Sequence, residues 1–109
     1  MKKQTLLRAS ILMIVVGTAQ AEDVVVVQKD KAFSRRIVTL VVGDRLVFKN
    51  EDSVIHHTYS LDADFIFSSI RQKPGGDTSI VMNSPGTATI RCGIHPRMKL
   101  VVNVKQSRK

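Results

Sequence analysis

The sequence predicts an all-β fold, a sandwich built from short strands. Apolar residues come in short runs rich in Val and Ile, and these runs show no helical period. Gly, Pro and Asp separate the runs at intervals of about 8–12 residues, which is the spacing of a β-sandwich or Greek-key barrel. The chain is long enough for one domain with one core, and not for two.

Residues 1–21 are expected to be a secretory signal peptide rather than part of the fold. The segment has a basic start, an apolar middle and a small-x-small end, provided by Lys2, Lys3 and Arg8, by Leu6–Val16 and by Ala19–Ala21. A membrane anchor is the alternative, but the apolar run Ile11–Val16 is far shorter than the roughly 20 residues of a spanning helix. We therefore expect an exported, periplasmic domain over residues 22–109, with no membrane span in its mature form.

Seven strands are expected within this domain: Val24–Val27, Ile37–Val42, Arg45–Lys49, His57–Leu61, Thr78–Met82, Thr87–Arg91 and Met98–Lys105. The pair Gly43–Asp44 predicts a tight turn. The segment Asp62–Gly76 has no clean period and is expected to be a loop or a short irregular helix. In the final strand the alternation places Leu100, Val102 and Val104 on one face.

Cys92 is the only cysteine, so the exported domain cannot form an internal disulfide. A lone thiol in an oxidising compartment is protected by burial or by a bound metal. The chain has 17 Lys and Arg against 9 Asp and Glu, and three of the basic residues lie in the leader. This mild positive charge favours an acidic partner through electrostatic steering. Nucleic-acid binding is not expected, because no motif supports it and aromatic residues are few.

The loop between the last two expected strands contains Cys92, His95 and Met98, separated by two residues each. A loop this short can turn all three side chains toward one point. Soft sulfur donors combined with imidazole select copper, and two His, one Cys and a weak axial Met form the ligand set of an electron-transfer copper site. A second histidine is therefore required. His56 and His57 are both available, and since neighbours in a strand point to opposite faces, spacing alone leaves the choice open.

The chain at this point resembles the cupredoxin family, and within it the amicyanin and plastocyanin-like group. The short Cys-x-x-His-x-x-Met loop carries most of the resemblance, and the turns Lys73–Gly76 and Ser84–Thr87 add to it. In that group the first histidine ligand follows an Asn by six residues, as His56 follows Asn50. The resemblance implies a Greek-key β-sandwich of about seven or eight strands. It also implies one type 1 copper ion held by His56, Cys92, His95 and Met98.

The function that this resemblance implies is single-electron transfer between redox partners such as a dehydrogenase and a c-type cytochrome. The resemblance also implies that the protein is a monomer and not an enzyme. A copper-binding or copper-delivery protein that does not cycle electrons is the main alternative, and a metal-free interaction module is a third. A Cys92–His95 nucleophile pair would need a cleft and an orienting group, and the sequence shows neither.

The resemblance also implies surroundings for the site. The side chain of Asn50 is expected to bond across to the backbone near Cys92, although a role as a strand-end turn residue is equally consistent. An apolar patch around His95 is expected from Ile94, Pro96 and Phe65 or Phe67, ringed by Arg71, Arg91, Arg97 and Lys99. The sequence departs from the family at three places: no aromatic residue shortly precedes Cys92, Gly93 replaces a hydroxyl residue, and His57 replaces an Asn.

Overall fold

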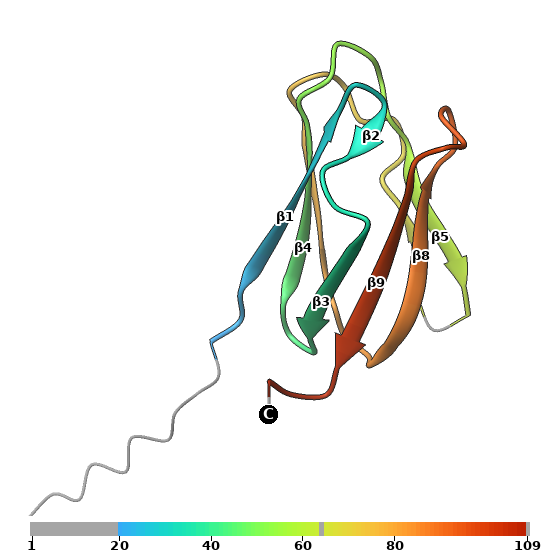
Figure 1. Cartoon of the computed structure of the whole chain (residues 1–109). Helices are drawn as coiled ribbons and strands as arrows, with labels where there is room; N and C mark the ends of the chain where they lie inside the picture. Colours follow the sequence, from blue (N-terminus) through green and yellow to red (C-terminus); the bar gives the residue numbers. More distant parts are fainter. Residues whose placement is uncertain (1–19, 64, 109) are drawn as a thin grey trace, which may run out of the picture.

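The computed structural model describes residues 20–63 and 65–108, which form nine strands in two β-sheets (Figure 1). The strands are β1 (Asp23–Lys29), β2 (Ala32–Phe33), β3 (Ile37–Val41), β4 (Arg45–Asn50), β5 (Thr58–Asp62), β6 (Phe65–Ser68), β7 (Asp77–Val81), β8 (Gly86–Cys92) and β9 (Lys99–Lys105). Of the expected signal peptide, only Gln20 and Ala21 fall within the described residues. No helix in this described part is long and apolar enough to cross a membrane.

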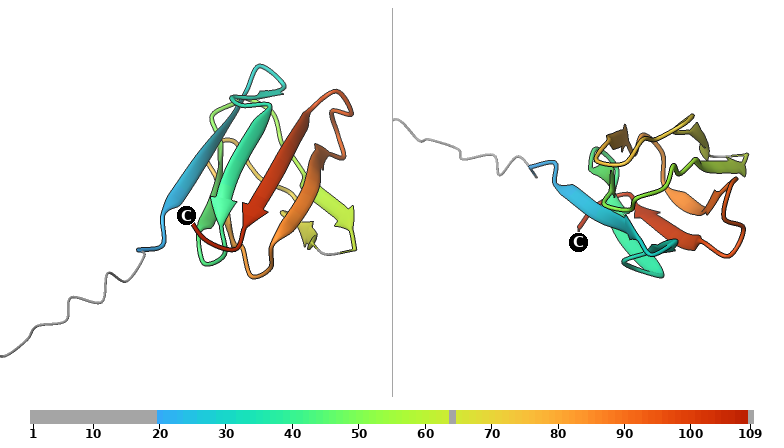
Figure 2. Two further views of the ribbon diagram at one scale, coloured as in Figure 1. Left: turned by 60° about the horizontal axis from the view of Figure 1, so that its bottom comes forward. Right: turned by 90° about the horizontal axis from the view of Figure 1, so that it is seen from above.

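The two sheets have the strand orders β2-β1-β4-β7 and β3-β9-β8-β5-β6. Two neighbouring pairs are parallel, β1 with β4 and β3 with β9, and the others are antiparallel. Consecutive strands therefore pass repeatedly between the sheets. The strands run along the long axis of the sandwich in Figure 1, and the right-hand view of Figure 2 shows the sandwich from above. The expected all-β sandwich is confirmed.

Two strands lie where the sequence predicted none. β6 falls inside the segment expected to be a loop, where Phe65 and Phe67 are half-buried and Ile66 is exposed. Three consecutive apolar residues hide this alternation. β2 contains only two residues and pairs with the end of β1 across the Asp30–Lys31 turn. Both turn residues have positive φ, 52° and 57°, as the two central residues of a tight hairpin require.

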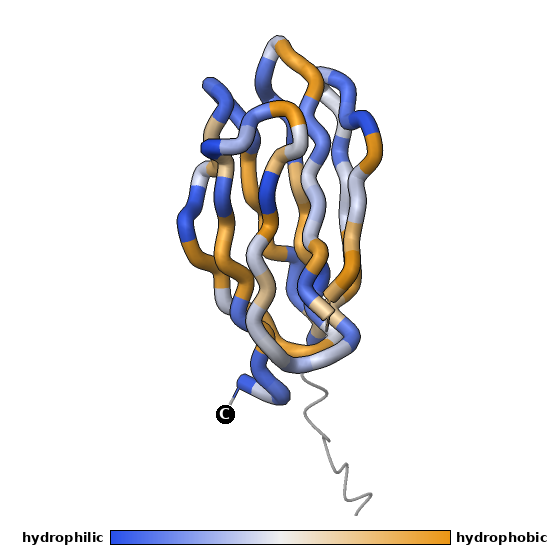
Figure 3. The backbone as a smooth tube through the Cα atoms, turned by 90° about the vertical axis from the view of Figure 1, so that its right-hand side faces the viewer, coloured by the Kyte–Doolittle hydropathy of each residue, from blue (hydrophilic) through white to orange (hydrophobic). Residues whose placement is uncertain are grey.

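The core lies between the sheets, and Phe48 is its largest fully buried side chain. Its ring stacks on Phe67 at a centroid distance of 6.0 Å and lies 5.9 Å from Phe33. Leu100 and Val102 are fully buried, and Val104 packs against the same cluster, so the face predicted for the last strand is confirmed. Figure 3 shows apolar stretches along the strands, and burial alternates in β7 and over most of β8, as expected for strands with one buried face.

The two ends of the sandwich differ in their connections. At the upper end in Figure 1 lie the β1–β2 turn, the segment between β4 and β5, and the β8–β9 loop. At the lower end the predicted turn is formed by Gly43, at φ +98°, and by Asp44, whose N–H donates to Val41 O at 3.0 Å. The buried Asp44 carboxylate accepts the N–H groups of Val41 and Glu22 and pairs with Arg108. The residues singled out for metal binding are all at the upper end.

Candidate metal centre

The β8–β9 loop begins at Cys92, the last residue of β8, and ends at Met98, just before β9. Antiparallel pairing continues to Arg91 and Lys99, so the sheet fixes both ends of the loop. The N–H of Met98 donates to His95 O at 3.0 Å and closes a turn inside the loop. Cys92 and Met98 are buried, with 1% and 2% exposure, whereas His95 is only half-buried.

His56 reaches the loop from the segment between β4 and β5. It forms an isolated bridge with Gln72, in which each backbone N–H donates to the other residue's carbonyl, at 3.1 and 2.8 Å. Its side chain is fully buried. The imidazole of His57 instead lies 2.7 Å from the Ser68 hydroxyl and beside the Tyr59 ring. Of the two histidines that spacing left open, His56 is therefore the one that lies with the loop residues.

His56, Cys92 and His95 form a compact triangle of donor atoms. The two Nδ1 atoms are 3.3 Å apart, and Cys92 Sγ lies 3.6 Å from Nδ1 of His56 and 3.8 Å from Nδ1 of His95. A metal ion in a trigonal plane has its three donors at 120°, with bonds of about 2.0 Å to nitrogen and about 2.3 Å to sulfur. In that geometry the two nitrogens are about 3.5 Å apart, and each nitrogen is about 3.7 Å from the sulfur. The triangle has this size, so the donor set fits a metal ion in a trigonal plane.

Two hydrogen bonds donated by backbone N–H groups join the histidine segment to the β8–β9 loop. The N–H of His57 donates to Cys92 Sγ at 3.4 Å, and the N–H of Gly93 donates to His57 O at 2.8 Å. Gly93 has no side-chain hydroxyl, and the link is made by its backbone N–H together with the Cys92 sulfur. A Cβ atom at Gly93 would meet His57 Nδ1 and Tyr59 Cε1 at an ordinary 3.8 Å, so the position is not sterically closed.

Asn50 does not bond as the resemblance implied. Its side chain donates to Val54 O at 2.9 Å and to Gln72 O at 3.0 Å, and its Oδ1 accepts the N–H of Asp52 at 2.9 Å. The expected bond to the backbone near Cys92 is therefore wrong. Asn50 acts as a turn residue that holds its own segment and the Gln72 bridge in place.

Asp52 is a part of the site that the sequence reading missed. Its Oδ2 lies 3.0 Å from His56 Nε2 and also accepts the N–H of Lys31 at 2.9 Å. The hydrogen bond from the Lys31 N–H is the largest influence on the pKa of Asp52 and lowers that pKa below its ordinary value of 3.8. Burial acts in the opposite direction and raises the pKa, whereas the contacts with His56 and Ser53 lower it further. The side chain is thus a carboxylate at neutral pH. The available signal was an acidic residue four positions before a histidine candidate.

His95 lies at the edge of the site, where its surroundings favour the neutral imidazole. Burial lowers the pKa of His95 below its ordinary value of 6.5; the nearby His56 and Lys31 lower it further, and Asp52 opposes them. Only the neutral ring has a lone pair to offer a metal ion. The electrostatic environment is therefore compatible with a ligand role.

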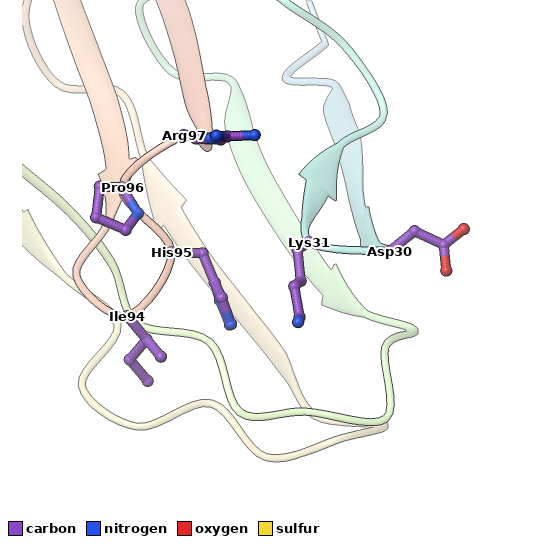
Figure 4. A pocket seen from close by; sticks show the side chains of 6 residues that line it. All are labelled: Asp30, Lys31, Ile94, His95, Pro96 and Arg97. Carbon is purple, nitrogen blue, oxygen red and sulfur yellow. The ribbon is translucent and has the colours of Figure 1, made fainter.

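A shallow hollow opens beside His95, and Figure 4 shows the side chains around it. Its lining residues are Asp30, Lys31, Ile94, His95, Pro96 and Arg97. Figure 4 shows the end of the Lys31 side chain beside the His95 ring. Lys31 was not foreseen, because its place depends on the β1–β2 turn, which the sequence did not reveal.

Part of the surface predicted around His95 is corrected. Ile94 and Pro96 lie there as expected, but Phe65 and Phe67 pack against the core instead. Of the four basic residues predicted to ring His95, Arg97 lines the hollow. Arg91 lines a different hollow, and Arg71 and Lys99 are not among the lining residues.

Comparison with known proteins identifies the fold. No family model matches the sequence, and no curated protein matches it either. Among solved structures, a Cu(I) amicyanin in which a methionine is replaced by alanine has a TM-score of 0.72 and 19% identity, over 76% of this chain and 82% of that one. A second amicyanin variant in the Cu(I) form also has a TM-score of 0.72, with 18% identity over 82% and 88% of the two chains.

A copper-containing nitrite reductase from Thermus scotoductus SA-01 gives the same TM-score, 0.72, at 24% identity. The match covers 78% of this chain but 23% of the reductase. It therefore concerns one part of a larger protein. These likenesses, together with the two-sheet topology, show that the chain has the cupredoxin fold.

Proposed function

We propose that this protein is a blue copper electron carrier that holds one type 1 copper ion through His56, Cys92, His95 and Met98. The observation that carries the proposal is the triangle of two imidazole nitrogens and one thiol sulfur, with separations of 3.3, 3.6 and 3.8 Å. A bound copper ion supplies one-electron chemistry at such a site. The amicyanins with the same fold are copper proteins by name, which supports the choice of metal.

The surroundings of the donor triangle suit a copper ion whose ligands must stay in place when its oxidation state changes. Cys92 and His56 are almost wholly buried, and the sulfur accepts the N–H of His57. The hydrogen-bonded Gln72 bridge holds His56, and paired strands hold both ends of the loop. Rigid positioning of ligands reduces the motion that accompanies each change of oxidation state. His95 is half-buried and lines the surface hollow, so we propose that electrons reach a partner through it.

Met98 is proposed as the weak axial ligand. Its side chain is buried, at 2% exposure, at the end of the same loop, and its N–H donates to His95 O. A thioether is a soft, uncharged donor, which is the type that completes a trigonal copper site. Replacement of Met98 by Leu should therefore retain copper binding and alter the reduction potential.

We further propose that the chain is exported to the periplasm, with cleavage after Ala21, and that the mature domain is a monomer. The basic start, apolar middle and small-residue end of residues 1–21 support export. Its partners are proposed to be redox proteins such as a dehydrogenase and a c-type cytochrome, docking over the hollow beside His95. An enzymatic role for Cys92 is not proposed, because the thiol is buried and does not line that hollow.

The test is optical titration of the purified domain with Cu(II). We expect an intense visible sulfur-to-copper charge-transfer band at one equivalent, lost in Cys92→Ala and in His56→Ala. His57→Asn is the matched control, because it removes the neighbouring imidazole and leaves the backbone N–H in place; it should keep the band. A colourless wild-type protein would contradict the proposal.

Voltammetry then separates electron transfer from copper delivery. A carrier should show a reversible one-electron wave and retain its copper against a competing chelator. Rapid loss of copper to the chelator without a reversible wave would instead favour the delivery role.

A further inference from the structure

Asp52 contacts the proposed copper site without being a ligand. Its Oδ2 lies 3.0 Å from Nε2 of His56, on the side of the ring away from the Nδ1 atom that faces Cys92 and His95. The carboxylate is only 10% exposed, and the His56 ring is fully buried. A hydrogen bond between two side chains that are this well buried fixes the tautomer of the imidazole more firmly than a surface ion pair does.

Two backbone N–H groups bind the carboxylate, and the Asn50 side chain binds the backbone of Asp52 itself. Its Oδ2 accepts the N–H of Lys31, its Oδ1 accepts the N–H of Ser53 at 3.1 Å, and its own N–H donates to Asn50 Oδ1. The Lys31 contact comes from the β1–β2 turn, a different part of the fold. Asp52 is therefore positioned from two directions, and its place does not depend on His56.

A carboxylate can only accept, so the hydrogen of the neutral His56 ring must lie on Nε2. Nδ1 then carries the lone pair, and it points into the donor triangle. We propose that Asp52 is a positioning residue that holds His56 in the Nε2–H tautomer and makes Nδ1 a stronger donor, so that the site favours Cu(II) over Cu(I). This inference rests on the proposed copper function.

The preference for Cu(II) follows from charge. A carboxylate hydrogen-bonded to a ligating imidazole raises the basicity of that ligand. Its negative charge also stabilises the doubly charged ion more than the singly charged one. In the described part of the chain, no carboxylate lies within hydrogen-bond distance of His95, so the two imidazoles are unequal: His56 is the stronger, oriented donor.

The test compares Asp52→Asn with the wild type, with Glu51→Gln as matched control. Glu51 is the preceding residue and is exposed, so its replacement removes the same charge without touching His56. We expect Asp52→Asn to weaken Cu(II) binding by tenfold or more, as loss of such outer partners does, and to weaken Cu(I) binding less. Each tenfold difference between the two affinities raises the reduction potential by about 59 mV. Glu51→Gln should leave both affinities near those of the wild type.

Nitrogen-15 NMR of the metal-free protein reads the tautomer without copper, at a pH where the imidazole is neutral. We expect His56 in the Nε2–H form in the wild type and in Glu51→Gln, and a mixture of tautomers in Asp52→Asn. Because this arm needs no metal, failure of the wild type to bind copper would refute the proposed function and leave the tautomer result readable.

Asp52→Glu provides the conservative replacement, since it keeps the charge beside His56. We expect its potential to stay closer to the wild type than that of Asp52→Asn. Three results would overturn the inference: a wild-type His56 protonated on Nδ1, an Asp52→Asn variant with an unchanged potential, or equal shifts in the Glu and Asn variants. The last result would show that only the packing of the loop matters.

Discussion

Asn50→Ala removes three hydrogen bonds at the base of the segment that carries Asp52 and His56. Two are donated by the side-chain amide to Val54 O and Gln72 O, and one is accepted from the N–H of Asp52. Each bond contributes about 0.5–1.5 kcal/mol net, and Asn50 is buried, so its partners lose bonds that water replaces poorly. We therefore expect the free energy of unfolding to fall by about 2–4 kcal/mol.

Urea denaturation of the metal-free domain measures this loss directly, and equal m-values would show that both proteins unfold from similarly compact states. Asn103→Ala is the matched control, because the side chain of Asn103 accepts an exposed hydrogen bond from the Thr87 hydroxyl. It should cost no more than about 0.5 kcal/mol. A loss below about 0.5 kcal/mol in Asn50→Ala would refute the assignment of Asn50 as the residue that holds this segment.

Three further predictions concern the rest of the fold and its surface. Burial by itself would raise the pKa of Asp44, but hydrogen bonds from two backbone N–H groups and from Arg108 outweigh it and hold that pKa below its ordinary value of 3.8. The contribution of Asp44 to stability is thus present above that pH and is lost as the pH falls through the lower folded-state pKa. Asp44→Asn should therefore flatten the acid limb of a stability profile measured by urea denaturation. Leu100→Ala, at a fully buried position, should cost about 2–5 kcal/mol of unfolding free energy in the same assay, whereas a similar loss in Leu61→Ala, at 79% exposure, would contradict the assigned faces. Lys31→Ala should slow oxidation of the reduced copper protein by ferricyanide about two- to threefold at low ionic strength, and the difference should vanish at high salt. A rate that is unchanged at low salt would argue against a role for Lys31 in attracting anionic partners.

The strands with clean patterns were predictable, and those whose form depends on distant contacts were not. β4 and β9 are runs rich in Val and Leu between polar residues, next to recognisable turn signals, and the structure places both close to the expected positions. β6 was missed because Phe65–Phe67 is apolar throughout, and only the packing of Phe67 on Phe48 decides which residues face inward. β2 exists because of the Asp30–Lys31 hairpin turn, whose positive φ values carry no strong signal at a lysine.

The same distinction holds for the candidate site. The order of Cys92, His95 and Met98 in one short loop was visible in the sequence, because local spacing alone brings these residues together. The choice of His56 over His57 depended on a family pattern, and the structure supports it by bringing His56 to the loop. Lys31 could not be foreseen, since its contact with Asp52 joins segments that only the folded topology makes neighbours. For Asp52 the sequence offered only its place four residues before His56, which does not by itself show that the two side chains meet.

The most direct test of the copper site is X-ray absorption of the protein loaded with one equivalent of copper. The fine structure reports which atoms bind the ion and at what distances, independently of any change in colour. The triangle of His56, Cys92 and His95 predicts two nitrogen donors and one short copper–sulfur bond in the copper-loaded wild type, with that short bond lost in Cys92→Ala. A first shell of nitrogen and oxygen alone in the wild type would contradict the account.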